Sequence, residues 1–128
     1  MALSYTIDRS RCRVTVVVTA QPSLEQFVQV MTRLLADPAF ERGDDILWNR
    51  QGSRALPTQG YVEVTVHWVH YHQPALGHGR VAFVAPEGVP AVYGMARMLE
   101  LLSEQLIQLR VFTVLDEAVR WLDERFTT

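Results

Sequence analysis

Short runs of β-branched residues alternate along this chain with stretches whose apolar residues recur at helical spacing. The run Val14–Thr19 is the densest and has the composition of a buried strand. Between Leu24 and Leu35, apolar residues then mark one face of a helix. Ile46–Trp48, Arg80–Pro86 and Arg110–Phe112 repeat the strand signal, and helical patterns follow the last two. This alternation favours an α/β layer fold with a mainly parallel sheet.

Local signals predict where several elements begin and end. Ser4–Ile7 and the β-branched run after it flank a polar turn, which predicts an antiparallel hairpin at the start of the sheet. Ser23 and Gln26 have the spacing of a capping box, and Asp37-Pro38 predicts the end of that helix. Thr113 and Asp116 are expected to cap the last helix. The inward residues expected on the last two helices are Val92, Met95, Ala96, Leu99, Leu102, Leu106, Ala118, Val119, Leu122 and Phe126.

The segment between residues 61 and 73 fits two structures. Val62–Trp68 alternates like a strand, but the alternation fails at Val69. As a helix, the segment would place Glu63, His67 and His70 on one polar line. Because parallel strands need a crossover connection, we predict a helix here, with a strand as the alternative.

Composition limits the classes of protein to which the chain can belong. Its 128 residues suit one domain, and a net charge of −2 argues against general binding to nucleic acid. All twelve basic residues are arginine, so no lysine can form a Schiff base. The single cysteine excludes an internal disulfide, and neither a signal peptide nor a membrane-spanning run is visible. We therefore expect a cytoplasmic protein.

Six stretches along the chain carry a family likeness. They are Tyr5–Asp8, Leu34–Phe40, Arg80–Pro86, Tyr93–Met98, Val111–Phe112 and Asp116–Leu122. In this combination they resemble the small bacterial SpoIIAA-like (STAS-like) family, which is related in fold to anti-sigma-factor antagonist domains and more loosely to CRAL-TRIO lipid carriers. The resemblance implies a two-layer α/β fold with a mixed, mainly parallel sheet of four or five strands and about four helices. It implies little about function, because one fold supports many functions.

Two positions depart from that resemblance. The family commonly has an aspartate in the strand where this chain has Asn49, whose side chain cannot ionise. True anti-sigma-factor antagonists carry a phosphorylated serine at a helix start after the third strand. This chain offers Ser53 and Thr58 nearby, without the surrounding Asp-Ser-Ser pattern. Phosphorylation at Ser53 would be the counterpart here, outside the pattern of the true antagonists.

Polar residues around the histidine-rich segment are candidates for a metal or anion site. On a helix, Glu63, His67 and His70 would stack along one face, close enough to share Zn²⁺ or another divalent ion. The spacing matches no known zinc motif, and the alternative is a solvated face or a subunit contact. Gly77–Arg80 could present backbone donors and an arginine to an anion, with a plain flexible connection as the alternative.

A ligand pocket is the other candidate site. Tyr93 and Arg97 lie on the helix that begins at Pro90 and could line a pocket at the strand ends, where α/β sheets hold ligands. Core packing and an ion pair of Arg97 are the alternatives. The aromatic and methionine residues that would supply an apolar wall are Tyr61, Trp68, Met95 and Met98.

Three functions remain open at this point. The first is a non-catalytic regulatory or protein-interaction module, self-association to a homodimer included. The second is a domain that binds a small apolar ligand or lipid near Tyr93 and Arg97. The third is a metal-dependent enzyme that uses His67 and His70. It ranks last, because no acid–base or nucleophile–base pair can be named. We predict no catalytic residue and no cofactor.

Overall fold

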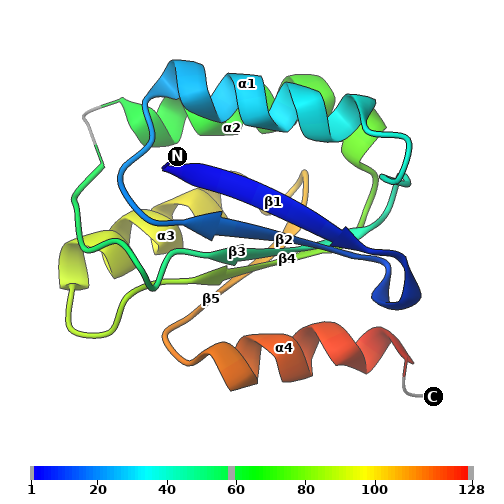
Figure 1. Cartoon of the computed structure of the whole chain (residues 1–128). Helices are drawn as coiled ribbons and strands as arrows, with labels where there is room; N and C mark the ends of the chain where they lie inside the picture. Colours follow the sequence, from blue (N-terminus) through cyan, green and yellow to red (C-terminus); the bar gives the residue numbers. More distant parts are fainter. Residues whose placement is uncertain (1, 58–59, 127–128) are drawn as a thin grey trace.

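The computed structural model describes residues 2–57 and 60–126, which form a five-stranded mixed sheet and four α-helices (Figure 1). The strands are β1 (Leu3–Asp8), β2 (Arg13–Val18), β3 (Asp45–Asn49), β4 (Arg80–Val84) and β5 (Gln108–Phe112). The helices are α1 (Leu24–Ala36), α2 (Tyr61–Leu76), α3 (Pro90–Leu102) and α4 (Leu115–Asp123). Short 3-10 turns, η1 and η2, occupy Arg9–Arg11 and Glu124–Phe126. The predicted α/β fold with a mixed sheet is confirmed.

The strands follow one another across the sheet in chain order. β1 and β2 form the predicted antiparallel hairpin, in which Leu3 pairs with Val18. β2 to β5 are all parallel, as the strand–helix alternation predicts. The ends of these four strands therefore meet at two edges, one of amino ends and one of carboxyl ends.

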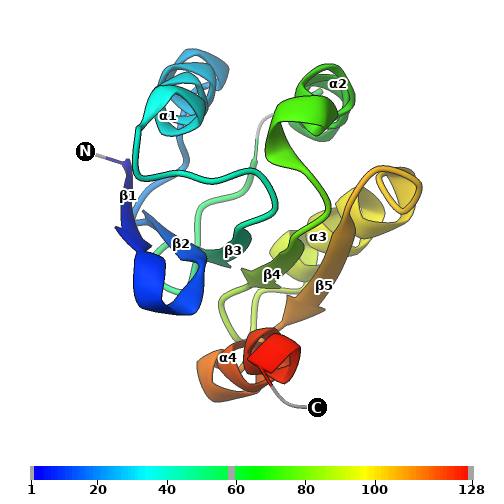
Figure 2. The ribbon, with the colours of Figure 1, turned by 90° about the vertical axis from the view of Figure 1, so that its right-hand side faces the viewer.

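Helices cover the two faces of the sheet unequally. α1, α2 and α3 lie over one face, and α4 lies on the other (Figure 2). Side chains alternate accordingly along the strands. Phe83 of β4 packs in the cluster under α3, whereas its neighbours Ala82 and Val84 pack against α4. α2 contacts α1 and α3 on its two sides.

The helix boundaries confirm most local predictions and correct one. Ser23 and Gln26 form the reciprocal capping box, and α1 ends before Asp37. The residue that precedes α4 is Val114, which has no side-chain cap, so the predicted capping by Thr113 and Asp116 is wrong.

Two residues predicted to face inward are largely exposed. Leu102 is 54% exposed because it lies in the last turn of α3, where the chain turns away toward β5. Phe126 is 48% exposed because α4 ends at Asp123 and the helical periodicity does not continue through the following 3-10 turn. Helical spacing therefore assigns the wrong face in the last turn of a helix and beyond its end.

The segment that fitted two structures is helical, and the predicted helix is confirmed. Its polar line is confirmed too, because Glu63, His67 and His70 are exposed. On the other side of the helix, Val62 and Val66 are half-buried. Its buried residues are Tyr61, Thr65, Trp68, Val69 and Leu76.

Candidate functional site

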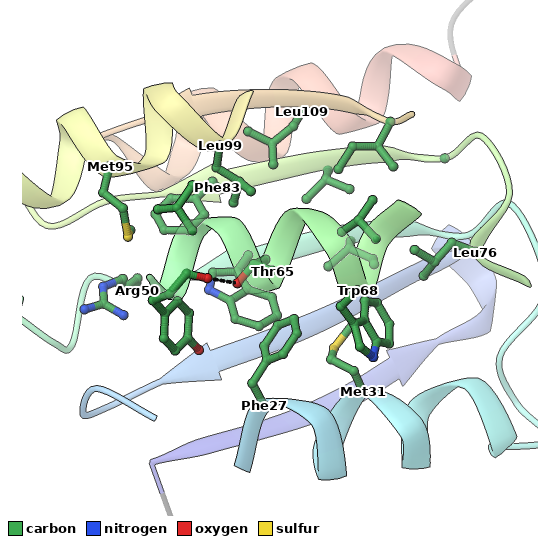
Figure 3. A pocket seen from close by; sticks show the side chains of 18 of the residues that line it. Phe27, Met31, Arg50, Thr65, Trp68, Leu76, Phe83, Met95, Leu99 and Leu109 are labelled. Carbon is green, nitrogen blue, oxygen red and sulfur yellow. Dashed lines mark hydrogen bonds between the residues drawn. The ribbon is translucent and has the colours of Figure 1, made fainter. Parts of the chain in front are cut away.

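An apolar cavity of about 90 Å³ lies between α2, α3 and the sheet (Figure 3). Residues of α2, of its neighbours α1 and α3, and of the strands beneath these helices line the cavity. For comparison, an engineered apolar cavity of about 150 Å³ accommodates benzene. The space therefore suits a short aliphatic chain without movement of the walls. The bulky apolar residues that line it include Phe27, Met31, Trp68, Phe83, Met95 and Leu109.

The lining runs along the whole of strand β3. Asp44, which precedes β3, and Arg50, which follows it, both belong to the lining. At about 3.3 Å per residue these two positions are roughly 20 Å apart. Tyr61 lines the end near Arg50, and Gly77 lines the end near Asp44. The site is therefore elongated, with one end at each edge of the parallel sheet.

The residue of α2 that faces the middle of this cavity is Thr65 (Figure 3). Its hydroxyl donates a hydrogen bond to the carbonyl oxygen of Tyr61 at 2.8 Å. The hydroxyl is thus satisfied within the helix, and the small side chain leaves space over the sheet. A longer apolar side chain at this position would fill that space.

Arg50 brings a positive charge to the carboxyl edge of the sheet. The residue is 3% exposed, and its Nη2 donates to Gln21 Oε1 and to the carbonyl oxygen of Ala55, both at 2.6 Å. Its Nε has no hydrogen-bond partner, and no acidic side chain in the described ranges forms an ion pair with it. Burial lowers the pKa of this guanidinium from its ordinary value. Buried charges are usually paired, so the arrangement is unusual.

Two aromatic side chains of the lining also carry unpaired polar atoms. The Tyr61 hydroxyl and Trp68 Nε1 are buried, and neither has a hydrogen-bond partner within residues 2–57 and 60–126. Burial raises the pKa of Tyr61 to about 12, so the phenol is neutral at ordinary pH. Phe27 packs edge-on against both rings, with centroids 6.2 and 5.5 Å away. The cavity thus has firm aromatic walls and a few unsatisfied donors.

The pocket predicted from the sequence overlaps this cavity only in part. Trp68 lines it, as do Tyr61 and Met95. Tyr93, Arg97 and Met98 do not, since they are exposed on the outer side of α3. Arg97 forms an ion pair with Glu100, one turn along α3.

Arg50 and Thr65 are residues of this site that the sequence reasoning missed. A single arginine after a strand belongs to no motif, and the loop that buries it is irregular. One available signal was its position, because it directly follows a buried parallel strand, and ligands gather at that edge of a sheet.

The structure does not gather the predicted metal ligands into a site. Across residues 2–57 and 60–126, no group of three or more His, Cys, Asp or Glu side chains could hold a metal ion. Glu63, His67 and His70 lie within that range, on the exposed face of α2. His72 packs against the Trp68 ring, with centroids 4.3 Å apart.

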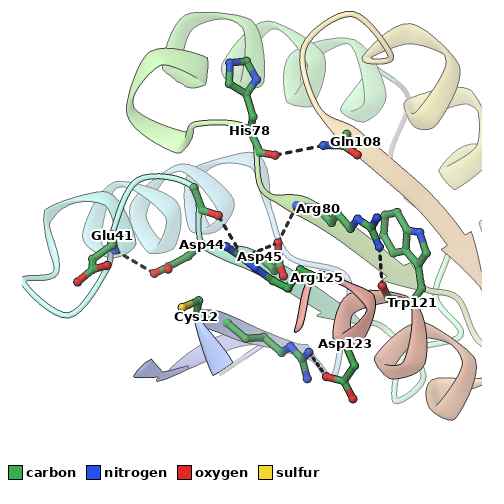
Figure 4. Close-up of polar contacts among 12 residues, drawn as sticks. Cys12, Glu41, Asp44, Asp45, His78, Arg80, Gln108, Trp121, Asp123 and Arg125 are labelled. Atoms are coloured by element: carbon green, nitrogen blue, oxygen red, sulfur yellow. Dashed lines mark hydrogen bonds and ion pairs between the residues drawn. The ribbon is translucent and has the colours of Figure 1, made fainter. Parts of the chain in front are cut away.

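A polar cleft of about 200 Å³ lies at the amino edge of the sheet (Figure 4). Asp45, at the start of β3, is buried there. Its Oδ1 accepts the backbone N–H of Arg80 at 2.9 Å and lies 3.0 Å from Nη1 of Arg125. The Arg80 guanidinium in turn donates to the carbonyl oxygen of Trp121 at 2.7 Å and pairs with Glu124. These contacts hold the C-terminal end of α4 against the sheet, and both Arg80 and Arg125 have acceptors within the protein.

Further ion pairs lie around the neighbouring hairpin turn, and one that involves Arg13 also holds α4. Arg13 lies 2.6 Å from Asp123 of α4, and this hydrogen bond lowers the pKa of the carboxyl. Asp44 pairs with Arg9 and accepts the backbone N–H of Glu41. Asp44 is therefore compensated by a cation, unlike Arg50 at the other end of the cavity.

The glycines of the Gly77–Arg80 stretch allow close backbone contact. A Cβ atom on Gly79 would lie 2.3 Å from the carbonyl oxygen of Asp44, and one on Gly77 would lie 2.6 Å from the Gly43 nitrogen. The connection is thus closely packed against the loop before β3, and it is not the loose connection that its composition suggests.

Ser53 lies in the loop after β3, and its hydroxyl is buried without a hydrogen-bond partner among the residues described. A kinase needs access to the hydroxyl, so phosphorylation would require this loop to open. Thr58 lies outside the described residues. Asn49, at the end of β3, accepts a hydrogen bond from the backbone N–H of Gln51 at 3.0 Å and so supports the turn.

Comparison of the chain with protein-family models, with curated proteins and with solved structures yields no match. Of the helices in the described part of the chain, none has the length and apolar character needed to cross a membrane.

Proposed function

We propose that this chain is a binding domain for a small, elongated and mainly apolar molecule, held in the cavity between α2 and the sheet. The observation that carries the proposal is the cavity itself, about 90 Å³ of space lined mainly by apolar and aromatic side chains. Such sites usually combine apolar walls with a small number of polar groups that fix orientation. Arg50, Tyr61 and Trp68 supply polar groups of that kind.

The proposal also draws on the resemblance to SpoIIAA-like domains. The sheet, with its antiparallel first strand and four parallel strands, agrees with what that resemblance implies for the fold. Membership of that family and a cytoplasmic location remain part of the proposal. Because fold alone does not determine function, the cavity carries the argument.

The first experiment is native mass spectrometry of freshly purified protein beside its denatured mass, followed by titration with hexanol. Trp48 and Trp68 line the cavity, whereas Trp121 lies on α4 and packs against the other face of the sheet, so hexanol binding should change the tryptophan fluorescence. Thr65→Leu fills the cavity and should abolish the change. Val64→Leu, at an exposed neighbouring position of the same helix, is the matched control.

Two outcomes contradict the proposal. One is a wild-type protein whose fluorescence and thermal stability do not respond to hexanol. The other is equal binding by wild type and Thr65→Leu, which would place the hexanol elsewhere on the molecule.

A second candidate function is self-association through the outer side of α3. Met98, Leu101 and Leu102 are exposed apolar residues there, next to the ion pair of Arg97 with Glu100. A surface that carries both charge signs is complementary to itself in a two-fold symmetric pair. The occupant we propose is thus a second copy of this chain. Light scattering should then show a dimer for wild type and a monomer for Leu101→Glu, and a wild-type monomer at high concentration would contradict it.

A further inference from the structure

The two ends of the cavity differ in charge, and this difference bears on the chemistry of the ligand. At the amino edge, the carboxylate of Asp44 is already paired with Arg9. At the carboxyl edge, Arg50 is almost fully buried, and no acidic side chain of the described residues compensates it. Taking an ion out of water costs several kcal/mol unless a counter-charge is present. The Arg50 end therefore favours a ligand that brings a negative charge.

Two further groups at the same end favour an anion. The Tyr61 hydroxyl is buried, lacks a partner and interacts electrostatically with Arg50. Tyr61 is also the first residue of α2, a sixteen-residue helix whose preceding residue, Gly60, provides no side-chain cap. The first N–H groups of a helix lack partners within it, and its dipole attracts negative charge. An arginine, a phenol and a helix start thus border the same apolar cavity.

We propose that the ligand of this cavity ends in a carboxylate, which Arg50 and Tyr61 bind at the carboxyl edge of the sheet. The aliphatic part then extends beneath Thr65 toward Leu76, at the opposite end of the cavity (Figure 3). The ligand class is a short-chain carboxylic acid in its ionised form. This inference rests on the proposed function, because it assigns the chemistry of the same cavity.

The hydrogen bonds of Arg50 to Gln21 and Ala55 are compatible with this role. They use Nη2, hold the guanidinium in place and leave Nε without a partner. A guanidinium fixed before binding loses little freedom when the carboxylate arrives. The free Nε–H can donate a charge-assisted hydrogen bond to a carboxylate oxygen, which is stronger than a neutral one.

The test compares hexanoate with hexanol, which differ at the head group and share the chain length. Wild type should bind hexanoate about tenfold or more tightly than hexanol, the ratio expected for a gain of about 1.4 kcal/mol from a charge-assisted contact. Arg50→Gln should lose this preference while its hexanol affinity stays within about twofold, because the chain contacts are unchanged. Arg54→Gln removes the same charge from an exposed position of the same loop and should keep the preference.

Each other outcome has a separate meaning. Equal binding of hexanoate and hexanol by wild type would overturn the carboxylate assignment and leave the apolar cavity standing. A preference that survives in Arg50→Gln would overturn it as well, as would acetate bound as tightly as hexanoate. If neither hexanoate nor hexanol binds, the proposed function itself fails. Should Arg50→Gln not fold, the wild-type comparison and Tyr61→Phe, which should weaken hexanoate more than hexanol, decide the question.

Discussion

The unpaired hydroxyl of Tyr61 should make the free protein less stable than a variant without it. The hydroxyl is buried and has no hydrogen-bond partner in the described part of the chain, and Tyr61→Phe removes it with little change of shape. A buried polar group without a partner costs about 1–3 kcal/mol. We expect Tyr61→Phe to raise the free energy of unfolding by about 1 kcal/mol, the low end of that range.

This gain converts into a measurable shift of melting temperature. Unfolding entropy is about 2.1 cal/mol/K per residue near 60 °C, which for 128 residues gives roughly 0.27 kcal/mol/K. A gain of about 1 kcal/mol therefore raises Tm by about 4 °C. Differential scanning calorimetry of ligand-free protein, with urea unfolding as a second measurement, would detect it.

Tyr5→Phe is the matched control, because it removes the same kind of hydroxyl group from a position where that group has a hydrogen-bond partner. The Tyr5 hydroxyl donates to Oδ2 of Asp37 at 2.8 Å, so its loss should lower stability by about 1 kcal/mol. The two substitutions should thus shift Tm in opposite directions. If Tyr61→Phe lowers Tm as Tyr5→Phe does, the Tyr61 hydroxyl has a partner in solution, and the reasoning about an unpaired donor in the cavity is refuted.

Three further predictions follow from pKa shifts and glycine contacts. Burial raises the pKa of Tyr61 to about 12, so the unfolded chain ionises this phenol at a lower pH than the folded protein does. The stability that this pKa difference contributes is complete below pH 10 and is lost as the pH rises toward 12. Alkaline unfolding of wild type and Tyr61→Phe should diverge in that window, and parallel curves would contradict the prediction. The hydrogen bond from Arg13 lowers the pKa of Asp123. The stability that this bond contributes is therefore present at neutral pH and is lost as the pH falls through the folded-state pKa of Asp123. Urea midpoints of wild type and Asp123→Asn should converge in acid, and a constant difference would exclude this linkage. Gly94→Ala should stabilise the protein by up to about 1 kcal/mol, because the glycine is helical and nothing described lies within 4 Å of the new methyl group. Gly79→Ala should destabilise the protein, because its methyl group would meet a backbone carbonyl. Equal urea midpoints for the two variants would contradict both predictions.

The sequence predicted the elements well because their signals are local. The β-branched run of β2 and the capping box at Ser23 depend on neighbours along the chain, and both are confirmed. α2 was ambiguous, because its β-branched residues favour a strand while its periodicity fits a helix. Parallel strands need a crossover connection between them, and this requirement led to the correct prediction of a helix.

The candidate site was harder to predict, because it depends on contacts between distant segments. Trp68, chosen by residue type, lines the cavity, whereas Met98, chosen on the same grounds, and Tyr93, chosen by its place on the helix, are exposed. Residue type does not tell which side of α3 faces the sheet near its ends. Arg50 is buried by loops with no periodic pattern, so its environment appears only once the chain has folded.

The composition of α2 has a consequence for the speed of ligand exchange. Most residues around the cavity are buried and α2 covers it, so movement of α2 away from the sheet would open a way out for a molecule held there. β-branched side chains weaken a helix, and α2 contains several, together with Pro74. Opening of α2, rather than contact with the ligand, would then set both the association and the dissociation rate. An exposed substitution that strengthens the helix, such as Val64→Ala, would lengthen the residence time and slow entry equally, so that Kd stays the same while the exchange becomes slower.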